Sequence, residues 1–184
     1  IDFLRKIFIK QQSKIWEKAN KVIVISESIR DWLEKLNSSI KPTVIPYGVE
    51  VQEVSQKNKL ANPTLGYLGK LNKNKGIEDL IDVYTKFQEK ENSSNFELTL
   101  LIGGTGSENY IKSLKNKIKE NTVKFLGYVE DRYSFFESIE IFVFPSYSEG
   151  LGLVLLEAMA HGVICITRDV TPMNSIVDLS LIHI

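Results

Sequence analysis

The spacing of hydrophobic residues divides the chain into short buried strands and amphipathic helices. Apolar positions between Ile7 and Ala19 recur at helical intervals and predict a first helix that ends near Asn20. The β-branched run Val22–Ile25 predicts a short buried strand. Apolar residues at i, i+3, i+4 and i+7, starting at Ile29, predict a second helix behind that strand.

Local signals refine this first part of the chain. Ser26 and Ser28 both stand where the second helix needs an N-cap. Val44–Ile45 predicts another short strand, which Pro46-Tyr47-Gly48 closes. Residues 50–62 are polar and show no hydrophobic periodicity, so we interpret them as an interdomain linker.

From residue 63 onward, strands and helices alternate. Strands are predicted at Thr64–Leu68, Glu97–Ile102, Val123–Leu126, Ile141–Phe144 and Val163–Thr167. Helices are predicted at Ile77–Lys90, Ser107–Lys119, Asp131–Ser138 and Gly152–His161. This alternation predicts an α/β fold, a doubly wound, Rossmann-like parallel sheet covered on both faces. Such sheets bind ligands at the carboxyl ends of their strands, so the loops after the strands are where chemistry is expected.

Composition narrows the functional classes. The chain has 184 residues, of which 43% are hydrophobic and 25% charged, as in ordinary globular proteins. Lys plus Arg and Asp plus Glu each count 23, so no net positive charge favours nucleic acid as a partner. A single cysteine, Cys165, excludes an internal disulfide and a cysteine-based zinc site, and it suits a reducing compartment. No apolar run reaches the roughly 18 residues of a membrane span.

Glycines and lysines gather in the loops after the first strands of the alternating part. Gly69–Gly76 holds three lysines before a predicted helix, which is typical either of an anion site or of a solvated turn. In Gly103–Ser107, three glycines, Gly104 among them, would let a ligand approach the backbone closely or would simply form a tight turn. The segment Gly127–Asp131 is either a plain connecting loop or a backbone edge that hydrogen-bonds a base, with Tyr128 beside it. No P-loop motif occurs, and Asn109 stands where a dinucleotide-binding motif would need glycine.

The loop after Phe144 carries the sharpest signal. It holds Glu149 and leads into an otherwise apolar helix that carries Glu157. A carboxylate among apolar side chains is costly unless it has partners. Glu157 could point to solvent, or it could grip two vicinal hydroxyls, each of which donates one hydrogen bond to it.

At this loop the sequence resembles a retaining glycosyltransferase of family 4, the glycosyl transferases group 1, which has the two-domain GT-B fold. Glu149 and Glu157 form the family's E-x7-E motif. The other matching motifs, in family order, are Val24-Ile25-Ser26, Val44–Val49, Gly69-Lys70-Leu71 with Lys75-Gly76, Ile102–Gly106, Phe125–Val129, Phe144-Pro145-Ser146 and Ala158–Gly162. The resemblance runs from about Val22 to Thr167, and it departs from the family pattern at Arg168–Met173.

The resemblance implies a role for each matching side chain. Glu157 matches the glutamate that binds the ribose hydroxyls of the nucleotide sugar, and Glu149 matches the one that contacts the donor sugar. Lys75 matches the lysine that grips the diphosphate. Lys70 stands where arginine is usual, so it supplies charge without a bidentate fork. Backbone N–H groups at the start of the helix are expected to face the phosphates, those of Gly150, Leu151 and Gly152.

The resemblance also implies how the chain is divided. Residues 1–49 would be the end of an N-terminal acceptor domain, 50–62 the linker, and 63–178 the C-terminal nucleotide-sugar-binding domain. Residues 179–184 are either a native apolar C-terminus or the product of CTG TCT CTT ATA CAC ATC, bases that resemble a sequencing adapter. We favour the adapter and exclude these residues from the fold. We expect a truncated chain that is inactive by itself.

The expected partners are a nucleotide sugar, with a UDP-sugar as the family-level choice, and a glycan or lipid-linked acceptor. No metal is expected, because no Asp-x-Asp motif occurs. No cofactor is expected either, since the nucleotide sugar is the substrate. We expect a cytoplasmic protein. Basic and apolar residues interleave between Phe3 and Lys18, as in a helix that lies on the inner face of the membrane or packs on the first domain. A non-catalytic nucleotide-binding or regulatory domain of the same fold is the alternative function.

Overall fold

The computed structural model describes residue 9 and residues 11–51, 63–91, 98–118 and 121–177. The chain divides into two compact units, Ile1–Gly48 and Val49–Ile184. This division lies beside the boundary predicted at residue 49. The assignment of the first unit to an acceptor domain stays a prediction, and residues 52–62 and 178–184 lie outside the described residues.

The described residues of the first unit form a two-stranded parallel sheet and two helical segments. Strand β1 (Ile23–Val24) pairs with β2 (Thr43–Val44), and helix α2 (Glu27–Leu36) lies between them in sequence. Of the two candidate caps, Ser26 is the N-cap of α2, where its side chain accepts a hydrogen bond from Ile29 N. The predicted first helix is described as helical over residues 11–16. It ends before the predicted Asn20 and packs on α2 through an edge-to-face pair of Trp16 and Trp32.

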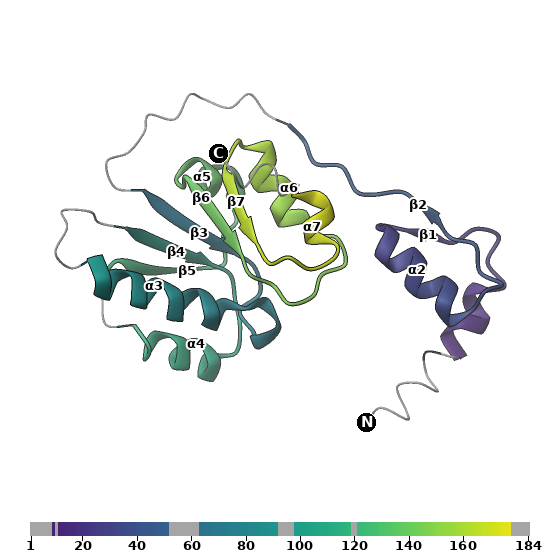
Figure 1. Cartoon of the computed structure of the whole chain (residues 1–184), viewed down its shortest axis with the longest axis horizontal. Coiled ribbons are helices and arrows are strands. Elements are labelled where there is room, and N and C mark those ends of the chain that lie inside the picture. The colour runs from purple at the N-terminus through teal and green to yellow at the C-terminus, as the bar shows by residue number, and fades with distance from the viewer. Residues whose placement is uncertain (1–8, 10, 52–62, 92–97, 119–120, 178–184) are drawn as a thin grey trace. The chain divides into compact units, whose positions relative to one another are not determined.

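The second unit is a five-stranded parallel sheet in the order β5-β4-β3-β6-β7. Its strands are β3 (Thr64–Leu68), β4 (Thr99–Gly103), β5 (Val123–Gly127), β6 (Ile141–Phe144) and β7 (Ile164–Thr167). Its helices are the 3-10 turn η1 (Lys73–Lys75), α3 (Ile77–Glu91), α4 (Glu108–Lys115), α5 (Arg132–Glu137), α6 (Leu153–Ala160) and α7 (Met173–Ile176). Figure 1 shows α3 and α4 on one face of the sheet and α5, α6 and α7 on the other.

Every strand predicted after residue 63 is present, within two residues at each end. The predicted helix Ser107–Lys119 is shorter, because α4 ends at Lys115 and the chain then turns. Two elements were not predicted, η1 and α7, and each is too short to show a hydrophobic period. The His161 backbone caps the end of α6, and Cys165 packs against the core, where burial raises the pKa of its thiol to about 12.

The strand order reverses between β3 and β6, which are neighbours in the sheet. The helices that follow these two strands, α3 and α6, lie on opposite faces (Figure 1). A crevice therefore opens at the carboxyl ends of β3 and β6, the usual ligand position in a doubly wound sheet. A core of aromatic and aliphatic side chains fixes this edge, and Tyr67, Phe142 and Leu155 in it are fully buried. Within the described residues, no helix is both long and apolar enough to cross a membrane.

Candidate functional site

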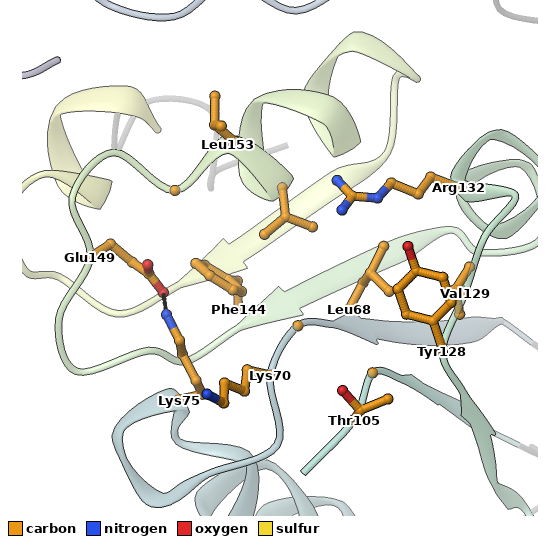
Figure 2. Close-up of a pocket in the computed structure, with 14 residues that line it drawn as sticks. Leu68, Lys70, Lys75, Thr105, Tyr128, Val129, Arg132, Phe144, Glu149 and Leu153 are labelled. Carbon is orange, nitrogen blue, oxygen red and sulfur yellow. Dashed lines mark hydrogen bonds and ion pairs between the residues drawn. The ribbon is translucent and has the colours of Figure 1, made fainter.

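A pocket of about 600 Å³ lies at the carboxyl ends of the strands. Loops after β3, β4, β5 and β6 and the first residues of α6 form its walls (Figure 2). Its lining residues are Leu68, Gly69, Lys70, Lys75, Gly104, Thr105, Tyr128, Val129, Arg132, Phe144, Glu149, Gly152, Leu153 and Val154. A pocket of this size holds a ligand of several hundred daltons.

An ion pair joins two loops at one end of the pocket. Lys75 Nζ donates to Glu149 Oε1 over 2.5 Å, and the two side chains are only 22% and 13% exposed. Figure 2 shows them pointing toward each other across the pocket wall. We call residues 69–76 the lysine loop and residues 145–152 the glutamate loop. The two residues are 74 positions apart in the sequence, so the pair depends on the contact between these loops.

Backbone contacts hold the two loops together. Tyr147 N donates to Asn74 O over 2.9 Å. The Oγ of Ser146, a fully buried residue, lies within hydrogen-bond distance of the carbonyl oxygens of Asn74 (3.3 Å) and Ser148 (3.2 Å). Gly76 has φ 66, and a Cβ on it would lie 2.1 Å from Pro145 O. Only glycine permits this approach.

A cluster of three side chains, which we call the aspartate brace, supports the glutamate loop from α3. Tyr147 donates its hydroxyl to Asp79 Oδ2 over 2.6 Å, and Arg168 Nη2 donates to the same oxygen over 2.5 Å. The Arg168 guanidinium lies 3.9 Å from the centroid of the Tyr147 ring, and its Nε donates to Pro145 O over 3.2 Å. The hydrogen bonds from Tyr147 and Arg168 lower the pKa of Asp79, and the bond to Asp79 raises the pKa of Tyr147.

Two backbone segments of the pocket lining, at Gly69 and Gly104, lie very close together. Gly104 has φ 133, and a Cβ on it would lie 1.7 Å from Gly69 O. Beneath the lysine loop, the buried Tyr67 donates its hydroxyl to Lys70 O over 3.1 Å. Burial raises the pKa of Tyr67, and the nearby charge of Glu149 adds to the increase. The Tyr67 phenol therefore stays neutral and acts as a hydrogen-bond donor.

The opposite end of the pocket carries a second ion pair. Arg132 Nη1 donates to both carboxylate oxygens of Glu157, over 2.7 Å and 2.9 Å. These side chains are 55% and 25% exposed, and Tyr128 beside them is 76% exposed. The partner that the sequence required for Glu157 is thus Arg132. Sequence reasoning did not identify it.

The start of α5 sets the position of Arg132. Asp131 is the N-cap: its carboxylate accepts hydrogen bonds from Ser134 N (3.0 Å) and Ser134 Oγ (2.6 Å), which lower its pKa. Arg132 is the next residue and therefore the first of the helix. An Asp-x-x-Ser capping pattern was visible in the sequence, but nothing local indicated that the arginine inside it reaches α6.

The structure gathers most of the predicted site residues around one pocket. The lining includes Lys70, Lys75, Gly104, Tyr128, Glu149 and Gly152. Gly150 and Leu151 are not among the lining residues; α6 begins at Leu153, so Gly152, Leu153 and Val154 stand there instead. Glu157 is not among the lining residues, but its carboxylate contacts Arg132, which is. Within the described residues, no group of three or more His, Cys, Asp or Glu side chains is placed to hold a metal ion.

A family model decides where the chain belongs. The model of the glycosyl transferases group 1 matches residues 62–180. The chain belongs to this glycosyltransferase family. Capsular polysaccharide biosynthesis glycosyltransferase CapM of Staphylococcus aureus is 33% identical over 171 residues, which are 83% of this chain and 44% of that protein. The O-antigen biosynthesis glycosyltransferase WclY of Escherichia coli is 28% identical over 85% of this chain and 45% of its own length.

Solved glycosyltransferase structures share the fold. Anabaena HepE in complex with UDP-glucose superposes with a TM-score of 0.79 at 20% identity, over 94% of this chain and 51% of that one. A mutant of S. aureus TarM in complex with UDP and α-GlcNAc-glycerol superposes with a TM-score of 0.77 at 24% identity, over 89% of this chain and 32% of that one. These likenesses confirm the predicted fold class, a doubly wound α/β domain of GT-B type. The chain spans less than half the length of the curated relatives named above.

Proposed function

We propose that the chain forms the donor-binding part of a retaining glycosyltransferase that moves a sugar from a nucleotide sugar to a glycan or lipid-linked acceptor. The observation that carries this proposal is the Lys75–Glu149 pair, which faces a pocket at the switch point of a chain that belongs to this family. HepE was solved with UDP-glucose and a TarM mutant with UDP, which supports a UDP-sugar as the donor here.

The lysine end of the pocket suits a diphosphate. Cleavage of the bond between sugar and phosphate leaves negative charge on the departing diphosphate. Lys70 and Lys75 both line the pocket, and the N-terminus of α6 adds the positive end of its dipole near Gly152. Cationic groups held where charge grows stabilise the transition state more than the ground state. The proposal assigns this work to the lysines and to backbone N–H groups, with no bound cofactor.

Glu149 has two proposed tasks. With the pocket free of ligand it neutralises Lys75, whose ammonium would otherwise be a largely buried, unpaired charge. With a donor bound, the diphosphate takes over that neutralisation, and the Glu149 carboxylate is available to the hydroxyls of the donor sugar. We propose that Glu157 accepts hydrogen bonds from the ribose hydroxyls, and that Gly104 and Tyr128 lie against the nucleotide.

The acceptor, the retention of configuration and a location at the inner face of the membrane remain proposals for the whole enzyme. The alternative is a nucleotide-binding domain without catalysis. Such a domain would bind the nucleotide with the same affinity, and its function would not require Glu149. The packing of Trp16 on Trp32 favours a first helix that contributes to its own unit over one that lies on a membrane.

Isothermal titration of the 184-residue chain with UDP, GDP, ADP and NAD tests the proposal. We expect one nucleoside diphosphate to bind, and Lys75→Ala to weaken it about tenfold or more, as loss of a charge-assisted bond does. Lys73→Ala is the matched control, because Lys73 lies two residues away on the same turn but does not line the pocket. Binding of NAD alone, or equal effects of the two substitutions, would contradict the proposal.

Catalysis is tested on the enzyme that contains this chain. We expect Glu149→Gln to abolish sugar transfer while nucleoside diphosphate binding stays within about threefold, since its charge is needed by the sugar rather than by the diphosphate. Glu130→Gln, in the loop before α5, serves as the control. Transfer that survives Glu149→Gln would favour the non-catalytic alternative for this domain.

A further inference from the structure

The Arg132–Glu157 pair stands at the end of the pocket away from the lysines. Leu153 and Val154 line the pocket, and Glu157 follows them at the i+4 and i+3 positions, so all three side chains lie on one face of α6. Arg132 lines the pocket from α5, on the side of Tyr128. Figure 2 shows its side chain extended from α5 toward the pocket. Glu157 itself is not among the lining residues, and its carboxylate lies beside the lining through its contact with Arg132.

The contact leaves half of the carboxylate's hydrogen-bonding capacity open. An ionised carboxylate accepts about four hydrogen bonds, two on each oxygen. Arg132 Nη1 contacts both oxygens, and so occupies one position on each. One acceptor position on each oxygen remains. A vicinal diol has two adjacent hydroxyl donors, which is the arrangement that this residual capacity fits.

The pair also fixes the plane of the carboxylate. A lone Glu157 would rotate about its side-chain bonds, because its neighbours on α6 are apolar and offer no donors. Arg132 bonds to both oxygens at once, from a helix start that Asp131 caps. Among the described residues, Nε and Nη2 of Arg132 make no hydrogen bond, so the guanidinium has no competing partner that would pull it from Glu157.

We propose that Arg132 is a positioning residue for the nucleotide: it orients Glu157 so that each carboxylate oxygen accepts one hydroxyl of the ribose diol. This inference rests on the proposed function, since it places a nucleotide in the pocket. It adds a determinant of affinity that lies 25 residues from Glu157 in the sequence and belongs to another helix.

The test compares ribonucleoside diphosphates with analogues that lack the ribose diol. UDP, GDP and ADP and their 2′,3′-dideoxy counterparts are titrated into the 184-residue chain. We expect the wild type to bind the ribose form about tenfold or more tightly than the dideoxy form, the range for hydrogen bonds to a charged group. Arg132→Met should remove most of this preference by weakening the ribose form alone. Arg132→Lys, which keeps the charge, should restore part of it.

Three further variants make the comparison specific: the double variant, Glu157→Gln alone and a control. Arg132→Met combined with Glu157→Gln should bind the ribose form no more weakly than Glu157→Gln alone, because the two residues act as one unit. Arg30→Met is the matched control, since Arg30 also forms surface ion pairs but belongs to the first unit. Thermal melts without ligand establish that each variant is folded.

Each other outcome overturns the inference in a different way. If Arg132→Met weakens the ribose and dideoxy forms equally, Arg132 contacts the ligand itself and is not a positioning residue. If the wild type binds a nucleoside diphosphate but shows no preference for the diol, the proposed function stands and this inference is wrong. If no nucleoside diphosphate binds, the proposed function fails and the inference fails with it.

Discussion

The two ends of the pocket are built differently. At the lysine end, the ion pair is largely buried, the two loops share backbone hydrogen bonds, and the aspartate brace supports them from α3. At the other end, the Arg132–Glu157 pair is more exposed and rests on the six-residue helix α5. Charges that act on a transition state work best when they are already in place, whereas groups that recognise a ligand can adjust to it. In the proposed function the lysine end holds buried charges against the diphosphate, and the other end holds a more exposed ion pair against the nucleotide.

A glycine substitution at the lysine end should destabilise the fold far more than one near the end that holds the Arg132–Glu157 pair. Gly76 (φ 66) and Gly127 (φ 70) both have left-handed backbones, so alanine is strained at either position. A Cβ on Gly76 would lie 2.1 Å from Pro145 O, whereas one on Gly127 meets nothing within 4 Å. We expect Gly76→Ala to lower the free energy of unfolding by about 3 kcal/mol or more and Gly127→Ala by about 1 kcal/mol. Urea denaturation measures both, and equal losses would show that the loops separate easily.

The aspartate brace should matter more than an ordinary surface pair on the same helix. Asp79→Asn weakens the bonds from Tyr147 and Arg168, and we expect it to lower the free energy of unfolding by about 1 kcal/mol. Asp82→Asn is the control, because Asp82 lies three residues along α3 and its ion pair is with the exposed Lys117. Its expected cost is below about 0.5 kcal/mol. Chemical denaturation compares the two, and a smaller loss for Asp79→Asn would show that the brace is incidental.

The hydroxyl of the buried Tyr67 should contribute more to the free energy of unfolding than the hydroxyl of the exposed Tyr128. Tyr67→Phe deletes the hydrogen bond to Lys70 O under the lysine loop, and we expect a loss of about 1 kcal/mol in the free energy of unfolding. Tyr128→Phe, at the open end, should change it by less than about 0.3 kcal/mol, since Tyr128 is mostly exposed. Thermal melts of both variants at neutral pH measure these losses of stability. Similar shifts for the two variants would contradict the burial argument.

The smallest expected effect is a pH dependence that both ends share. The pKa of Asp79 is lowered by Tyr147 and Arg168, and the pKa of Asp131 is lowered by Ser134. A carboxylate whose pKa is lower in the folded state adds stability above its unfolded pKa, about 4, and that stability is lost as the pH falls through the folded value. Melting temperatures at pH 6 and pH 3 should therefore differ less in Asp79→Asn and in Asp131→Asn than in the wild type. An unchanged pH dependence in both variants would contradict the lowered pKa values of Asp79 and Asp131.

Local sequence patterns were enough to predict the sheet and most of the pocket. Strands such as Ile141–Phe144 are apolar runs whose ends are marked by turn residues, and the loops with Lys75 and Glu149 follow directly from strand positions. Arg132 and Arg168 were missed because their partners lie 25 and 89 residues away. Hydrophobic periodicity carries no information on such pairs. The need of Glu157 for a partner could be predicted, but the partner itself could not.

The contact between Gly104 and Gly69 has a consequence for how such a pocket can change. A side chain at position 104 would overlap the carbonyl oxygen of Gly69, so at this one point of the lining only peptide groups can face a ligand. Peptide groups offer the same donors and acceptors whatever the surrounding sequence, so this point cannot be tuned by substitution. Selection for a new donor sugar or base has to act on the walls. A mutant library that fixes both glycines and varies Tyr128, Arg132 and Leu153 should retain folded proteins while altering what they accept.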